Sequence, residues 1–514
     1  MNAGTNRNAA GWAWLALALA FAASQAEAAA PTAGRRAGEI VVETRSLATP
    51  EGETLPYEIG TLFVPENRLA PGSRLIGVGF ARLRAEKPTG APPMFALPGG
   101  PGDSYLGAFT DGEGRERRLR AQLLKYRAAG DVVVIDQRGF SERGEVLTFP
   151  YPFTDLPLDR PASASADNAA IVATAKAVVA AHGDKDLSGY TVVQCVEDVN
   201  DLRRALGYDK ITLLGQSFGS QWSFGVMRLH PEIVARALLS GVEPLNNGYD
   251  MPAQVFAALQ RIAWEAEQDP ALKPYLPAGG LVGAVQAVRE RLAKAPVSVP
   301  LKDEKTGQVR TVVLGLGDFQ QSLVTPADAW PAFVLSLYYG HYDDWARSVA
   351  AQRKAGGAGQ AALIGVLIDS SLGVSADREH QLRSDPAMGL LGAWGFDPYI
   401  VSAPAWPTPD VGDDLRKPVA TDTPVLFVHG DWDTSTPVEN MLGMLPYFPA
   451  GRAIVVRRGG HGARAALLEQ QPRMMALVLD FLRTGETRNL PPTAELPAPK
   501  FRAPAFPAPA KRPS

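Results

Sequence analysis

Cysteine and histidine are scarce in this chain of 514 residues, which contains one Cys and six His. A single cysteine cannot form an internal disulfide, and it cannot build a cysteine-based zinc site. The formal net charge is also small, −3 at pH 7, with acids and bases interspersed, so the sequence carries no electrostatic footprint for nucleic acid or an anionic membrane. What is left is a globular composition, 46% hydrophobic and 20% charged, at a length that can bury a large core.

Long apolar runs are absent as well, apart from one at the N-terminus. Residues 9–24 are uncharged, follow a segment whose one cation is Arg7, and precede the small-residue sequence Ala26-Glu27-Ala28. This pattern is typical of a secretory signal peptide. The run is shorter than the about 20 apolar residues that a membrane-spanning helix needs. We therefore expect cleavage after Ala28 and a periplasmic or secreted protein that is not held in the membrane afterwards.

Short apolar runs recur along the rest of the chain and predict the strands of an α/β fold. They lie at 39–42, 60–64, 75–83, 94–97, 132–135, 211–214, 237–239, 425–428 and 453–456. Several are apolar without alternation, which is typical of a mostly parallel sheet covered on both faces by helices. Cys195 falls beside the apolar face of a predicted helix, 192–206, where we expect it to pack in the core.

The strand rhythm stops after residue 241 and returns only at 425. Between them the pattern is helical and aromatic, with the clearest helices at 251–267, 281–293, 330–337 and 343–354. We therefore predict a signal peptide at 1–28, a first core part at 29–246, a helical cap at 247–413, a second core part at 414–485, and a tail at 486–514. Because the tail is rich in Pro and Ala, we expect it to be extended and disordered.

The pentapeptide 215–219, Gly-Gln-Ser-Phe-Gly, has the G-x-S-x-G spacing of a nucleophilic serine. Such a short motif is weak on its own, but this one follows the apolar run 211–214 and opens a predicted helix, 220–230. A strand-to-helix turn of this kind projects a serine hydroxyl, and the flanking glycines leave room for the tight backbone. We therefore predict that Ser217 is a catalytic nucleophile.

A serine hydroxyl becomes reactive when a histidine accepts its proton and a carboxylate orients that histidine. Of the six histidines, His461 is the one in a glycine-rich loop between a strand and a final helix. The acid should follow the preceding strand, where residues 430–437 contain two aspartates. We choose Asp433 over Asp431 because the acid usually lies three residues beyond the glycine that ends the strand.

Acyl transfer also needs amide donors for the oxyanion, each worth about 10²–10³ in rate. One donor should be the amide of Phe218, directly after the nucleophile. The second should come from the loop 97–102, Leu-Pro-Gly-Gly-Pro-Gly, which follows an early strand. We favour Gly100 as this donor, with Gly99 as the alternative.

These segments together resemble the α/β-hydrolase serine peptidases that include proline iminopeptidase and tripeptidyl aminopeptidase. The order Ser217, Asp433, His461 is that of α/β-hydrolases. The matching segments are 99–102, 134–139, 215–219, 230–232, 430–437 and 460–461, and 60–66 resembles the secreted tripeptidyl aminopeptidase branch. The resemblance implies an α/β-hydrolase fold whose cap forms the substrate pocket. It also assigns residues 136–139 to shaping the loop beside the active site.

Two departures from these relatives concern substrate choice. Proline iminopeptidases usually have His where Pro98 stands, and secreted tripeptidyl aminopeptidases commonly carry cysteines in the insertion, which has none here. The resemblance also implies a carboxylate for a substrate amine, and Glu243 follows the strand after the elbow helix, although it could equally face solvent. The aromatic residues of the insertion could line an apolar subsite or simply form its core; they are Trp330, Tyr338, Tyr339, Tyr342 and Trp345.

Three functions are compatible with these residues. The first is a secreted serine exopeptidase that releases amino acids or short peptides from free N-termini through an acyl-enzyme. The second is a carboxylesterase that acts on small esters with the same triad, and the third is a noncatalytic binding protein on a hydrolase scaffold. For the enzymes, we expect a peptide or small acyl substrate and neither a metal nor an organic cofactor. The sequence does not indicate an oligomeric state.

Overall fold

The structure is a computed structural model that describes residues 32–49, 52–110, 113–150, 156–246, 248–302, 307–355 and 360–510. The signal peptide expected at 1–28 lies outside the described residues. Among the residues that are described, no helix has the length and apolarity to cross a membrane.

A ten-stranded sheet runs through the described part of the chain, in the order β1-β2-β3-β5-β4-β7-β8-β12-β13-β14. The first strands pair antiparallel up to the β3–β5 contact, and all later neighbours pair parallel. The strands are β1 (Ile40–Ala48), β2 (Thr54–Pro65), β3 (Leu75–Leu83), β4 (Met94–Leu97), β5 (Val132–Ile135), β7 (Ile211–Gln216), β8 (Val234–Ser240), β12 (Val425–Gly430), β13 (Arg452–Arg457) and β14 (Thr493–Glu495). All nine predicted strands are confirmed, and β14 is additional.

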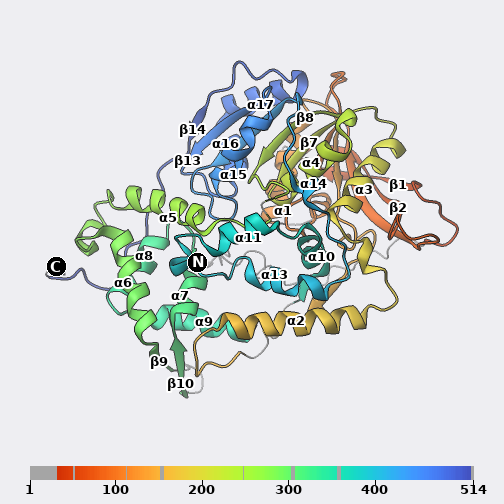
Figure 1. Cartoon of the computed structure of the whole chain (residues 1–514). Helices are drawn as coiled ribbons and strands as arrows, with labels where there is room; N and C mark the ends of the chain where they lie inside the picture. The colour runs from red at the N-terminus through yellow and green to blue at the C-terminus, as the bar shows by residue number, and fades with distance from the viewer. Residues whose placement is uncertain are drawn as a thin grey trace.

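Helices cover both faces of the sheet, and each layer has its own apolar core (Figure 1). One face packs against α1 (Arg115–Tyr126), α16 (Ala463–Gln470) and α17 (Pro472–Thr484). The other packs against α3 (Val192–Ala205), α4 (Phe218–Leu229), α10 (Leu363–Leu372) and α15 (Val438–Met444). Central strands such as β4, β5 and β12 are buried along their whole length, which explains their unbroken apolar sequences. Cys195 is fully buried in the second layer, as expected.

The insertion forms a cap with a separate apolar core. Its helices include α5 (Pro252–Ala266), α6 (Gly280–Lys294), α7 (Leu316–Ser322), α8 (Trp330–Tyr338) and α9 (Asp343–Ala355), followed by α11 (Ala376–Arg383), α12 (Met388–Leu391), α13 (Asp397–Ser402) and α14 (Asp413–Arg416). The helical prediction is incomplete, because β9 (Val297–Lys302) and β10 (Val309–Leu314) form an antiparallel hairpin within the cap.

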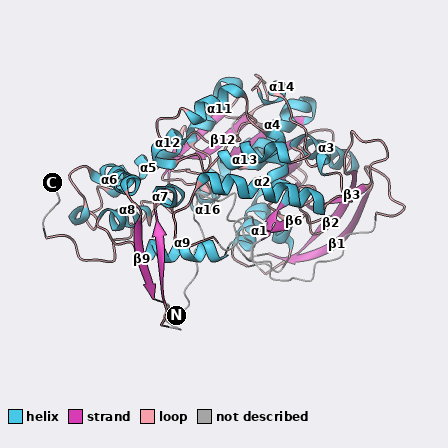
Figure 2. Ribbon diagram, turned by 60° about the horizontal axis from the view of Figure 1, so that its bottom comes forward, coloured by secondary structure: helices cyan, strands magenta, loops and turns pink. Residues whose placement is uncertain are grey.

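Residues before the nucleophile also contribute to the cap, which the sequence did not reveal. Helix α2 (Ala164–Ala181) packs along α13, as Figure 2 shows. The short strand β6 (Thr148–Pro150) pairs with β11 (Gln360–Ala362). The cap is therefore built on the core from two segments of the chain.

The C-terminal segment differs from the disorder expected of residues 486–514. Over 486–510 it first adds β14 to the sheet edge, parallel to β13, and then packs on the cap. Phe501 is buried in the cap core, and Phe506 lies against three cap rings. An extended, proline-rich backbone can still be ordered when such aromatic side chains find apolar partners. Residues 511–514 lie outside the described part.

Candidate active site

Ser217 lies in the sharp turn between β7 and α4, with φ 57° and ψ −133°. A non-glycine residue adopts this backbone conformation only when the surrounding structure enforces it. The flanking glycines are required for space, because a Cβ on Gly215 would lie 2.4 Å from the Gly219 carbonyl oxygen and one on Gly219 would lie 2.1 Å from that of Leu97. The turn therefore presents the serine hydroxyl at the carboxyl end of the sheet.

The structure brings His461 and Asp433 together at the same edge. Their side chains are joined by His461 Nδ1, which lies 3.0 Å from Asp433 Oδ2 and 3.2 Å from Oδ1. The imidazole lies beside the nucleophile turn: a Cβ on Gly241 would be 2.8 Å from His461 Cε1 and 3.3 Å from the Ser217 amide nitrogen. Gln216 Nε2 also donates to the His461 carbonyl, at 3.1 Å.

The Asp433 carboxylate is held by several donors from its own loop. The amides of Ser435 and Thr436 donate to Oδ1 at 2.9 and 3.0 Å, and the Thr436 hydroxyl donates to Oδ2 at 2.8 Å. Buried His429 supports the same loop, because its Nε2 lies 2.7 Å from the Thr436 carbonyl oxygen and 3.4 Å from Asp433 Oδ2. Its Nδ1 accepts from the Val242 amide at 3.2 Å, which leaves the proton on Nε2.

Electrostatics of the pair favour a charged aspartate. Burial acts to raise the pKa of Asp433, but the opposing charge of His461 and hydrogen bonds from His429 and His461 outweigh it and lower that pKa below its usual range. Burial lowers the pKa of His461, while the Asp433 charge and hydrogen bond raise it, with a net increase above the ordinary value of 6.5. A carboxylate that stays ionised can orient an imidazole that gains and loses a proton.

The alternative acid, Asp431, lies in a different environment. Its Oδ1 accepts from the Arg458 amide at 2.8 Å, and its carbonyl accepts from Arg261 Nε of α5 at 2.6 Å. No contact between the Asp431 carboxylate and His461 is found among the described residues. The Asp433 carboxylate, in contrast, contacts the imidazoles of both His461 and His429. The geometry therefore favours the predicted choice of Asp433.

The loop 98–102 lies directly over the nucleophile. A Cβ on Gly99 would be 3.2 Å from Ser217 Cβ and 3.8 Å from Ser217 Oγ, so a side chain here would press closely on the nucleophile turn. Gln137 pins the loop from beneath: its Oε1 accepts from the Gly102 amide at 2.7 Å, and its Nε2 donates to the Gly99 carbonyl at 2.7 Å. The role that the resemblance assigned to residues 136–139 is thus visible in Gln137. Both Gly100 and Gly99 remain available as oxyanion donors.

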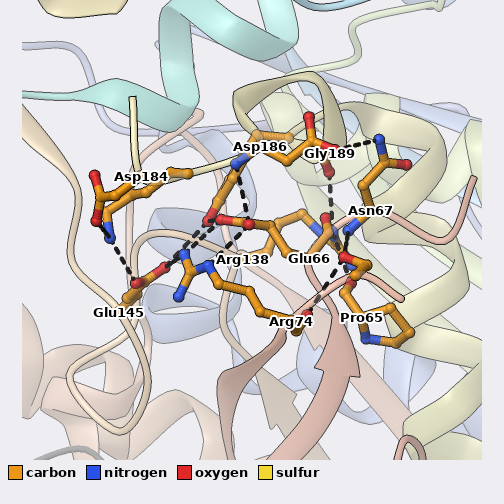
Figure 3. A network of polar contacts seen from close by, with 12 residues as sticks. Pro65, Glu66, Asn67, Arg74, Arg138, Glu145, Asp184, Asp186 and Gly189 are labelled. Atoms are coloured by element: carbon orange, nitrogen blue, oxygen red, sulfur yellow. Dashed lines mark hydrogen bonds and ion pairs between the residues drawn. The ribbon is translucent and has the colours of Figure 1, made fainter. Parts of the chain in front are cut away.

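Arg138, the residue after Gln137, joins separate segments of the fold instead of holding the loop 98–102. Figure 3 shows the polar network around it, which joins the end of β2 to the segment before α3. Its Nη1 donates to the carbonyls of Glu66 and Gly189, at 2.6 and 2.9 Å. Its Nε and Nη2 make a two-pronged ion pair with Asp198 at 2.8 and 2.6 Å. Both side chains of this pair are fully buried.

A cavity of about 120 Å³ opens beside the Asp433 loop and carries an acidic wall. Its lining includes Thr434 and Ser435, and three carboxylates: Glu243, Asp250 and Asp369. Glu243 is 5% exposed, and its Oε2 has no hydrogen-bond partner. Asp250 Oδ1 accepts from Asn440 Nδ2 at 2.7 Å. The sequence-predicted Glu243 therefore does not face solvent.

Burial is the main cause of the unusual ionisation of this wall. Burial and the neighbouring charges of Asp250, Asp369 and Asp433 raise the pKa of Glu243 well above its usual range. Burial likewise raises the pKa of Asp250 and that of Asp369, each to about 7. In the described part of the chain, no group of three or more His, Cys, Asp or Glu side chains is placed to hold a metal ion.

The aromatic residues singled out in the sequence do not line this cavity. Trp330 and Trp345 are buried in the cap core, and the three tyrosines pack against it. The cavity has other apolar walls, which come from the segment before α5 and from the stretch between the end of α12 and α13; they include Tyr249, Leu391, Trp394, Phe396 and Tyr399. Sequence reasoning missed these residues, together with Asp250 and Asp369, because no local motif marks them.

A larger surface cavity, of about 590 Å³, lies elsewhere on the molecule. It is lined by the end of β2, the following turn and the end of α3, and it contains none of the predicted site residues. Its charged side chains are already paired, since Arg68 binds Asp198 and Asp201 at 2.7 Å each. The chemistry therefore points to the smaller cavity.

Comparison with protein families agrees with this geometry. A model described as alpha/beta hydrolase fold matches residues 92–286, and one described as TAP-like protein matches residues 396–492. The chain has the α/β-hydrolase fold. Its family matches support hydrolase activity without separating peptidases from esterases. No curated protein matches the chain.

Solved structures of similar fold include enzymes with different activities. Proline iminopeptidase from Mycobacterium smegmatis is 16% identical over 83% of this chain and 98% of its own, with a TM-score of 0.38. A thermophilic esterase from Thermogutta terrifontis is 17% identical over 83% and 99%, with a TM-score of 0.33. A bromoperoxidase from Bacillus anthracis is 13% identical over 82% and 99%, with a TM-score of 0.35. These likenesses are too distant to indicate a substrate.

Proposed function

We propose that this protein is a secreted serine exopeptidase that releases amino acids or short peptides from free N-termini. The observation that carries the proposal is the buried, unpartnered Oε2 of Glu243 in an acidic cavity next to the Asp433 loop. An unpaired buried carboxylate oxygen costs about 1–3 kcal/mol or more, so a ligand that supplies a charged donor gains that interaction. The N-terminal ammonium group of a peptide is such a donor.

In this proposal the triad performs acyl transfer. Ser217 Oγ attacks the carbonyl carbon of the scissile bond while His461 Nε2 accepts the hydroxyl proton, and Asp433 holds Nδ1–H and stabilises the imidazolium. The amides of Phe218 and of Gly100, or Gly99, donate to the oxyanion. His461 then protonates the leaving amine, and water hydrolyses the acyl-enzyme with His461 as base.

The carboxylates would position the substrate rather than react with it. Glu243, Asp250 and Asp369 bind the ammonium at one end of the cavity, and the apolar rings hold the adjacent side chain. Binding a cation next to these groups lowers their pKa values, so the ammonium displaces protons from the wall as it enters. The acyl group of a simple ester is neutral, so in an esterase these carboxylates would have no cationic partner in the substrate.

The proposal is tested by comparing aminoacyl anilides that have a free amine with the same anilides N-acetylated. We expect kcat/KM to fall at least tenfold on acetylation, since a charged hydrogen bond of about 1.5–3 kcal/mol is lost. Equal rates on both substrates would identify an esterase-like or amine-independent enzyme. Complete failure of Ser217 to react with a fluorophosphonate would instead support a noncatalytic protein.

Variants of the acidic wall separate amine binding from chemistry. Glu243→Gln and Asp369→Asn should raise KM for the free-amine anilide about tenfold and leave kcat and the hydrolysis of a small ester nearly unchanged. Asp377→Asn is the matched control, because it neutralises an exposed cap carboxylate on α11 that does not line the cavity. An unchanged KM in both wall variants would rule out this amine site.

A further inference from the structure

The C-terminal strap, residues 496–510, connects three parts of the molecule. It leaves the sheet after β14, passes the Asp433 loop and ends on the cap, beside α6 and α8 in Figure 1. At its base, the Leu496 amide donates to the Arg457 carbonyl at 3.1 Å, and Arg458 Nη1 donates to the Leu496 carbonyl at 3.1 Å. This end of the strap is therefore fixed to the sheet.

The middle of the strap contacts the residue before the candidate catalytic acid. The rings of Phe501 and Trp432 lie 6.4 Å apart between centroids, and both are buried in the apolar core of the cap. The Trp432 amide donates to the Gly459 carbonyl at 2.9 Å, which ties the acid loop to the loop that carries His461. Trp432 thus links the acid loop to the His461 loop through its backbone amide, and to the strap and the cap core through its indole.

The end of the strap contacts the cap. The Arg502 amide and Nε donate to the carbonyl and carboxylate of Asp328, at 2.8 Å each. The Phe506 ring stacks on His341 at 4.0 Å between centroids and meets the rings of Tyr275 and Tyr339 at 5.5 and 5.6 Å. Tyr275 Oη donates to the Phe506 carbonyl at 3.0 Å.

Other links between the cap and these loops are polar and partly exposed. Arg261 pairs with Glu439 at 2.9 Å, and Glu265 pairs with Arg457 and Arg458 at 3.2 and 2.5 Å. Pairs of this kind contribute about 0–1 kcal/mol each. The packing of Phe501 on Trp432 is buried and contributes more, so this part of the strap is a substantial link between the cap and the acid loop.

We propose that the C-terminal strap is a positioning element of the active site. Phe501 acts through Trp432 to hold the loop of Asp433, and Phe506 holds the cap over the substrate cavity. The two phenylalanines should therefore affect different steps, because the first supports the triad and the second supports substrate binding. The proposal goes beyond the proposed function and depends on it only for the anilide measurements below.

The test compares Phe501→Ala, Phe501→Leu, Phe506→Ala and the control Lys500→Ala in the full chain. Lys500 is exposed and adjacent to Phe501, so its substitution leaves the apolar contacts intact. We expect F501A to slow fluorophosphonate labelling of Ser217 and to lower kcat about tenfold, since small displacements of catalytic groups are costly. Hydrogen exchange of the Ser435 and Thr436 amides should also accelerate. F501L should restore most of the labelling rate, and K500A should match the wild type.

F506A should instead raise KM for the free-amine anilide about tenfold, with an unchanged labelling rate, because the cap moves and the triad does not. Folded F501A protein with wild-type labelling and exchange would overturn the role of Phe501. If F501A does not fold, F506A tests the role of the strap at the cap on its own, and a wild-type KM in that variant would overturn that role. If the wild type labels but cleaves no anilide, the proposed function fails, while labelling and exchange still test the strap.

Discussion

At the scale of the residue, the backbone of Ser217 distinguishes a nucleophile from an ordinary serine. Ser217 is 7% exposed, and its backbone has a conformation that only glycine adopts readily, φ 57° and ψ −133°. Such strain persists at functional sites because the surrounding structure enforces it. Activity and stability should therefore respond differently to substitution at this position.

Ser217→Ala should lower kcat/KM about 10⁴–10⁶-fold with the fold intact. Ser217→Gly should be equally inactive, yet more stable than Ser217→Ala by about 1 kcal/mol, because glycine relieves the backbone strain. Anilide turnover and urea unfolding of both variants check this expectation. Retained turnover in either variant would remove Ser217 from the mechanism, and equal stability would show that the turn is unstrained.

The pH dependence should report the two groups of ionisable residues separately. Since His461 must be neutral to accept a proton, kcat should fall as the pH drops through its raised pKa, above 6.5. Asp433→Asn removes the charge that raises this pKa, so the midpoint of the residual activity should shift to lower pH.

Because Asp250 and Asp369, each with a pKa of about 7, must be ionised to bind an ammonium, KM should rise below about pH 7 for the free-amine substrate only. Profiles of kcat and KM on free and acetylated anilides test both statements, and a flat kcat between pH 5 and 8 would contradict His461 as the base.

At the scale of the element, the loop 98–102 depends on one glutamine from the end of β5. Gln137 bonds to the loop at both Gly99 and Gly102. The two bonds fix the backbone that faces Ser217 Oγ, and therefore the candidate oxyanion donors. Their loss should reduce transition-state stabilisation more than substrate binding.

Gln137→Met, which keeps the side-chain length, should lower kcat about 100-fold with little change in KM, because the donors move relative to the oxyanion. The measurement is steady-state turnover of the free-amine anilide, accompanied by hydrogen exchange of residues 98–102. Unchanged kcat with faster exchange in the loop would show that this loop does not supply an oxyanion donor.

Much of the site at this scale could be predicted because it is local in sequence. Ser217, Asp433 and His461 each follow a strand whose apolar run is visible, and each lies in a short motif. Asp250 and Asp369 could not be predicted, because they carry no motif and meet Glu243 only through the packing of the cap. The hairpin β9–β10 and strand β14 were missed for a similar reason: their pairing partners decide their conformation.

At the scale of the whole molecule, the buried Arg138–Asp198 pair joins the antiparallel strands to the helix layer behind the nucleophile. Asp198 lies on α3, and Arg138 reaches the carbonyls at the end of β2 and in the segment before α3 (Figure 3). A buried pair of this kind strongly destabilises the fold when one partner is removed. We expect the pair to stabilise the fold and not to bind substrate, since neither residue lines the acidic cavity.

Asp198→Ala should therefore lower the free energy of unfolding by about 3–5 kcal/mol. Asp201→Ala is the control, because that carboxylate pairs with partly exposed Arg68 and Arg204 and should cost about 1 kcal/mol or less. Denaturant unfolding measures both values. A loss of turnover in folded Asp198→Ala protein would show instead that this network reaches the active site.

The central claim is that the acidic cavity selects substrates with a free N-terminus. It is tested most directly by incubating the protein with an equal mixture of one peptide in free and N-acetylated forms, distinguished by an isotope label, and following both by mass spectrometry. We expect residues to be released from the N-terminus of the free peptide alone, with no release by Ser217→Ala. Equal cleavage of both forms, or cleavage only at internal bonds, would contradict the account.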